Sequence, residues 1–66
     1  MNITVNGEKQ SLEPGASLDK LLQSLGLEGK RIAVEVNRDI VPRSEYGRFE
    51  LSEDDTIEIV NAIGGG

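Results

Sequence analysis

Three glycines, Gly64-Gly65-Gly66, stand together directly after an apolar segment at the end of the 66-residue chain. Glycine has no Cβ atom, so such a tail can lie extended in a channel that is too narrow for side chains. The α-carboxyl group that follows is ionised at neutral pH and must be activated, for example by adenylation, before a nucleophile attacks it. We therefore predict that Gly66 is the modified residue and that Gly64 and Gly65 thread it into a partner. A frayed terminus without function is the alternative.

A partner that modifies Gly66 must bind the body of the protein, because three extended residues reach only about 10 Å. The segment from Thr56 to Ile63 alternates in the manner of a strand, with Ile57 and Ile59 on one face. Val60 and Ala62 then point outward and Ile63 ends the strand. We predict that Val60, Ala62 and Ile63 form the docking surface.

Other chemistry is poorly supported. The chain has no cysteine and no histidine, so catalytic residues and a metal site are not expected in it. The cluster Glu53-Asp54-Asp55 has no matching ligands elsewhere and predicts a solvated turn. The seven basic residues are dispersed, and the net charge of −5 disfavours nucleic acid or an anionic membrane and suits a basic protein surface.

The location that the composition favours is the cytoplasm. The first residues show neither a basic flank nor a long apolar run, so no signal peptide is predicted. No segment is long enough to span a bilayer, and the lack of cysteine is compatible with a reducing compartment.

The elements that position the tail follow from periodicity and turn signals. Asn6-Gly7 predicts a type I′ turn between a strand over residues 2 to 6 and a short strand over 9 to 12. Leucines at positions 18, 21, 22 and 25 predict a helix over about 17 to 26, with Ser17 as N-cap and Gly26 as the left-handed residue that ends it. Alternation predicts a strand over 31 to 37 and the last strand over 56 to 63. Residues 40 to 46 are predicted to be irregular because Pro42 cannot donate a hydrogen bond to a central strand. Residues 48 to 51 are predicted to form a short edge strand.

The order of these elements predicts an α+β fold of the ubiquitin-like β-grasp type. One helix would cover one face of a mixed four- to five-stranded sheet, with the first and last strands paired at its centre. The domain is expected over residues 1 to 63, followed by a flexible glycine tail over 64 to 66.

Several segments together carry a family resemblance. They are Ile3-Thr4-Val5-Asn6-Gly7, the leucine helix, Ala33-Val34-Glu35-Val36-Asn37, Ile40-Val41-Pro42-Arg43 followed by Tyr46, and Ile57-Glu58-Ile59-Val60 with the glycine end. In these segments the chain resembles the ThiS family, the sulfur carriers of thiamine biosynthesis.

One departure from the family pattern is visible: the turn before the last strand usually carries Gly-Asp in that family, and here it is Asp54-Asp55. Asp tolerates a left-handed conformation better than most residues, so the turn is expected to survive. For Tyr46, a role in covering the edge of the core is favoured over a direct contact with a partner.

The resemblance implies a carrier that is not itself an enzyme. An adenylating enzyme of the ThiF type would convert Gly66 to an acyl adenylate with ATP and magnesium, both bound by that partner. Sulfur from a cysteine-derived persulfide donor would then replace AMP, and the resulting thiocarboxylate would supply thiazole synthase of the ThiG type. The free carrier is expected to be a monomer.

Two alternatives stay open from the sequence. The small subunit of molybdopterin synthase resembles this chain in fold and tail but is usually longer and lacks the Ile-Val-Pro-Arg segment. A ubiquitin-like modifier or interaction module would use the same tail without sulfur chemistry.

Overall fold

The chain begins with a β-hairpin in the computed structural model, which describes residues 1–61. Strands β1 (Asn2–Val5) and β2 (Glu8–Ser11) pair antiparallel. The backbone of Asn6 and Gly7 between them has φ angles of 49° and 84°, and a two-residue turn of type I′ requires positive φ at both positions. The predicted turn is confirmed, and β2 begins and ends one residue earlier than predicted.

The helix α1 (Leu18–Ser24) has the predicted boundary signals. The Ser17 hydroxyl accepts a hydrogen bond from the Lys20 amide at 3.2 Å and so satisfies one of the free amides of the first turn. At the other end Gly26 has a φ of 73°, and the Leu27 amide donates to the Leu22 carbonyl at 2.9 Å. This is the ending that the sequence predicts. The regular helix is shorter than residues 17 to 26, because Ser17 is its N-cap and Leu25 is its C-cap.

The prediction for the following segment is wrong in two places. Strand β3 (Ile32–Val36) is followed by β4 (Asp39–Val41), which overlaps the start of the segment over 40 to 46 that was predicted to be irregular. Pro42 comes just after β4 and therefore removes no ladder hydrogen bond from it. The predicted edge strand over 48 to 51 is absent from the described chain, where Glu50 forms only an isolated bridge with Ser17 and a short 3-10 helix, η1 (Arg43–Glu45), precedes this region.

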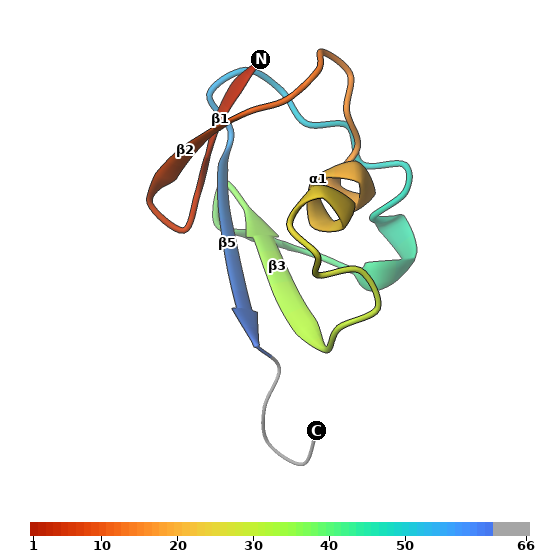
Figure 1. Cartoon of the computed structure of the whole chain (residues 1–66). Helices are drawn as coiled ribbons and strands as arrows, with labels where there is room; N and C mark the ends of the chain where they lie inside the picture. The colour runs from red at the N-terminus through yellow and green to blue at the C-terminus, as the bar shows by residue number, and fades with distance from the viewer. Residues whose placement is uncertain (62–66) are drawn as a thin grey trace.

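The last strand lies at the centre of the sheet. Strand β5 (Thr56–Asn61) pairs parallel with β1 and antiparallel with β3, and the strand order is β2-β1-β5-β3-β4. The helix covers one face of this mixed five-stranded sheet (Figure 1). The predicted α+β β-grasp arrangement, with the first and last strands paired at the centre, is confirmed.

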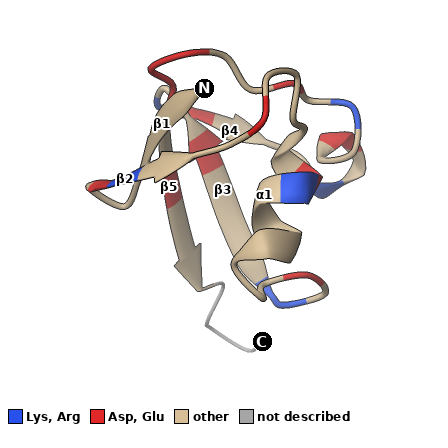
Figure 2. Ribbon diagram, turned by 45° about the horizontal axis from the view of Figure 1, so that its top comes forward, with Lys and Arg blue, Asp and Glu red and all other residues tan. Residues whose placement is uncertain are grey.

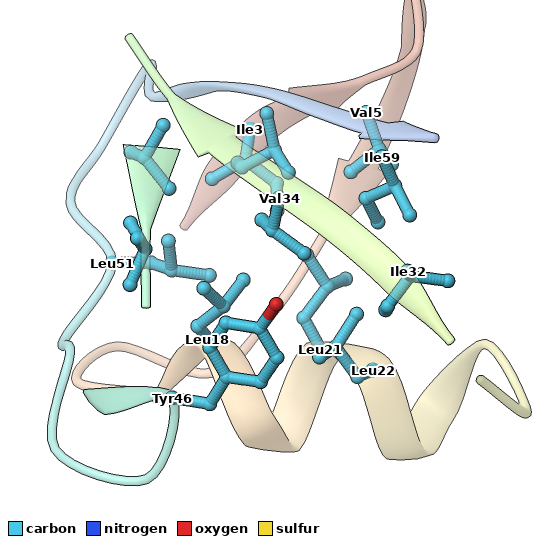
Figure 3. Close-up of a cluster of buried hydrophobic side chains, with 13 residues drawn as sticks. Ile3, Val5, Leu18, Leu21, Leu22, Ile32, Val34, Tyr46, Leu51 and Ile59 are labelled. Atoms are coloured by element: carbon cyan, nitrogen blue, oxygen red, sulfur yellow. The ribbon is translucent and has the colours of Figure 1, made fainter. Parts of the chain in front are cut away.

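The core lies between α1 and the covered face of the sheet (Figure 3). Alternate residues of β1, β3 and β5 meet Leu18, Leu21 and Leu22 of the helix. Tyr46 is 8% exposed and closes one end of this cluster beside Leu18, which agrees with its predicted role in covering the core edge. In the described chain no helix has the length and hydropathy needed to cross a membrane.

Candidate functional site

The candidate site is the strand that leads to the C-terminal glycines. Strand β5 is bonded along both edges, since Val5 and Ile57 are partners across the ladder to β1, and Val34 and Ile59 are partners across the ladder to β3. Ile57 is fully buried. A central strand with two neighbours opens less readily than an edge strand, so β5 fixes the point from which the rest of the chain departs.

The side chain of Asn6 extends the pairing of β5 beyond the end of β1. The chain turns away from β5 at Asn6, after the Asn6 amide has donated to the Ile57 carbonyl at 2.9 Å. The Asn6 carboxamide then takes the place of the missing strand: the Ile59 amide donates to Oδ1 at 2.8 Å, and Nδ2 donates to the Ile59 carbonyl at 3.1 Å. Asn6 thus satisfies both backbone groups of Ile59 that face this side.

Asn37 holds the start of β5 from the other side. Its amide donates to the Thr56 carbonyl at 2.7 Å, and its Oδ1 accepts from the Thr56 amide at 3.0 Å. Its Nδ2 also donates to Asp55 Oδ1 at 2.9 Å. The sequence pattern predicted Asn6 only as a turn residue and gave Asn37 no role of its own. The signal for both roles is an asparagine directly after a strand, because its side chain can imitate a peptide group.

The acidic turn before β5 has a structural role. The second carboxylate oxygen of Asp55 accepts from the Ser52 amide at 2.8 Å, and Glu53 Oε2 accepts from the Asn2 amide at 3.1 Å. Asp54 has a φ of 68°, so the left-handed conformation expected at this position is present. The turn is exposed as predicted, but its carboxylates bind backbone and side-chain amides of this chain, and among residues 1–61 no group of three possible ligands is placed to hold a metal ion.

The face of the sheet opposite α1 carries the exposed apolar residues. We define the open face as Ala33, Glu35, Ile40, Glu58 and Val60, which alternate along β3, β4 and β5 with the buried residues Val34, Val41 and Ile59. Val60 is 58% exposed, as the docking prediction requires, and lies opposite Ala33. Ile40 on β4 is 72% exposed and was missed by sequence reasoning, because its segment was not recognised as a strand.

The other residues of the predicted site lie outside the described residues. These are the modified residue Gly66, the threading residues Gly64 and Gly65, and the docking residues Ala62 and Ile63. The described chain therefore contributes Val60 from the predicted set. It also supplies what holds β5 in place, chiefly Asn6 and Asn37.

One helix on a mixed five-stranded sheet, with the first and last strands parallel at its centre, defines a ubiquitin-like β-grasp protein. The chain belongs to the ThiS family, whose sequence model matches residues 3–66. The predicted family is thereby confirmed.

Known relatives and a solved structure agree with this assignment. The chain is 47% identical over 66 residues to a thiazole synthase of Magnetococcus marinus, and it spans a fifth of the length of that protein. It is 42% identical over 50 residues, 76% of each chain, to the sulfur carrier protein ThiS of Bacillus subtilis. The crystal structure of the thiamine biosynthesis protein ThiS from Geobacter metallireducens superposes with a TM-score of 0.86 at 26% identity, covering all of both chains.

Proposed function

We propose that this chain is the sulfur carrier of thiamine biosynthesis and that its working group is the carboxylate of Gly66. The observation that carries the proposal is membership of the ThiS family over almost the whole chain, including the glycine end. Similarity to a protein described as a sulfur carrier supports it further. The chain acts as a co-substrate: a partner attaches AMP to the carboxylate, sulfur displaces AMP, and the thiocarboxylate is passed on.

Thiazole synthase is the proposed acceptor of the sulfur. Two proteins described as thiazole synthases, from Magnetococcus marinus and Paramagnetospirillum magneticum, each include a stretch similar to all of this chain, at 47% and 38% identity. A carrier joined to the enzyme that it supplies benefits from a high effective concentration. The family match and these relatives favour the thiazole pathway over molybdopterin synthesis and over a role as a protein modifier.

The reach of the chain requires a docked partner. Five residues follow Asn61, and fully extended they span at most about 17 Å. The adenylating enzyme, which supplies ATP and magnesium, and thiazole synthase must therefore each bind the body of the carrier close to the end of β5. We propose that Val60, with Ala62 and Ile63, belongs to the surface that they bind.

The test is ATP–pyrophosphate exchange by the adenylating enzyme of the same organism. Wild-type carrier is expected to support exchange, and a variant that lacks Gly66 is expected to abolish it while its free energy of unfolding is unchanged. Intact mass measurement of carrier isolated from cells should also reveal a fraction in which one oxygen is replaced by sulfur. Exchange that persists without Gly66, or carrier that is found only unmodified or linked to lysine, would refute the proposal.

A further inference from the structure

Two glutamates stand side by side in the middle of the open face. Glu35 of β3 and Glu58 of β5 are direct partners in the antiparallel ladder. The backbone groups of Ile57 and Ile59 point toward β1 and Asn6, so the backbone N–H and C=O of Glu58, between them, point toward Glu35 on β3. Glu35 and Glu58 are therefore a hydrogen-bonded pair, and the Cα atoms of such a pair are about 5.5 Å apart. Figure 2 shows acidic positions on both of these neighbouring strands. Like charges directly opposite one another destabilise a sheet, so this arrangement works against the stability of the free protein.

The described chain does not neutralise the pair. Among residues 1–61 neither carboxylate has a basic group within the 4.0 Å of a salt bridge. Arg38 lines the same hollow as the two glutamates, but it forms no ion pair with them. The chain as a whole carries a net charge of −5, which favours association with a basic partner surface.

Exposed aliphatic side chains flank the two carboxylates. Glu35 is also the partner of Ile40 on β4, so Glu58, Glu35 and Ile40 form one row across three strands. Val60 and Ala33 form the adjacent row. Val60 and Ile40 are the large apolar residues that are most exposed in the part of the chain that the structure describes. They lie on either side of β3, two strand spacings across and two residues along the strands, which places their Cα atoms about 12 Å apart. Exposed apolar residues that gather on one face mark surfaces that bind other proteins, and charged groups beside them select a partner of complementary charge.

We propose that the open face binds a basic side chain of the adenylating partner between Glu35 and Glu58, with apolar contacts to Val60 and Ile40 on either side. Two adjacent carboxylates suit the planar, multidentate guanidinium group of an arginine better than a metal ion, because the described chain offers no third ligand there. The partner's cation would relieve the repulsion between the glutamates. The pair therefore destabilises the fold of the free carrier and stabilises the complex with the partner. This inference rests on the proposed function for the identity of the partner.

The experiment compares two double variants of equal net charge. Glu35→Gln with Glu58→Gln removes both charges from the open face, whereas the control, Glu13→Gln with Glu45→Gln, removes two charges from exposed positions elsewhere. Titration calorimetry with the purified adenylating enzyme is expected to give a dissociation constant raised about tenfold or more by the first pair and altered less than about twofold by the control. The first pair should also reduce the dependence of binding on salt, since screening then has fewer charges to act on.

A stability measurement separates docking from folding. The open-face variant is expected to melt at the same temperature as wild type or higher, because a like-charged pair has been removed, and weaker binding by a more stable protein cannot result from misfolding. Equal dissociation constants for the two double variants would overturn the proposal, as would a lower melting temperature for the open-face variant. If wild-type carrier supports ATP–pyrophosphate exchange and the open-face variant binds the enzyme as tightly as wild type, only the docking contact is refuted. If wild-type carrier supports no exchange, the proposed function is overturned and this inference with it.

Discussion

Replacing Asn6 by glycine tests whether the side chain of Asn6 holds β5 in place. Glycine accepts the φ of 49° at this position, so the turn is preserved while the two hydrogen bonds to Ile59, at 2.8 and 3.1 Å, are lost. A typical hydrogen bond contributes about 0.5–1.5 kcal/mol, so Asn6→Gly is expected to lower the free energy of unfolding by about 1–3 kcal/mol. In a domain of this size that corresponds to a melting temperature lower by roughly 5–20 °C.

The measurement combines chemical denaturation with amide hydrogen exchange. The Ile59 amide should lose protection, because its acceptor in the folded protein is Asn6 Oδ1. Arg38→Gly is the matched control: Arg38 also has positive φ, at 73°, in a two-residue turn, and glycine there is expected to leave stability unchanged or to raise it by up to about 1 kcal/mol. Unfolding free energies for Asn6→Gly and wild type that agree within about 0.5 kcal/mol, with the Ile59 amide still protected, would refute the role of Asn6.

Two further substitutions probe the two faces of the sheet. Leu21→Ala, at a residue that is 1% exposed in the core, is expected to cost about 2–5 kcal/mol in a denaturant titration, and a loss below about 1 kcal/mol would mean that the core refills the space. Val60→Lys, on the open face, is expected to change the free energy of unfolding by less than about 0.5 kcal/mol. The same change should weaken binding to the adenylating enzyme about fivefold or more in calorimetry, and unaltered binding would exclude Val60 from the docking surface.

The sequence predicts the elements whose signals are local and mutually consistent. The helix α1 combines an N-cap at Ser17, a leucine stripe and a left-handed Gly26, and each of these signals is present in the structure. The turn at Asn6-Gly7 is equally explicit, because few residue pairs tolerate positive φ at both positions. These elements and the alternation of the remaining strands were sufficient to predict that the first and last strands pair at the centre of the sheet.

Strand β4 could not be predicted because its signals conflict. It is three residues long, Pro42 follows it at once, and its turn places Arg38 at a φ of 73°, where arginine is uncommon. Its stability comes from pairing with β3, which sequence periodicity does not reveal. The exposed Ile40 and its place beside Glu35 were missed for the same reason, since which residues face each other across strands depends on register.

The two asparagines that hold β5 connect the fold to the proposed chemistry. Asn37 secures the strand at Thr56 and Asn6 secures it at Ile59, so pairing continues beyond the end of β1 and up to the residue before Val60. A strand restrained in this way leaves little freedom in where the remaining five residues begin. Under the proposed function, the carboxylate of Gly66 must then act within about 17 Å of the end of β5, because five extended residues span no more than that. A partner that binds the open face thereby limits where this carboxylate can be, which is how a carrier without catalytic residues would contribute to the rate of its own modification.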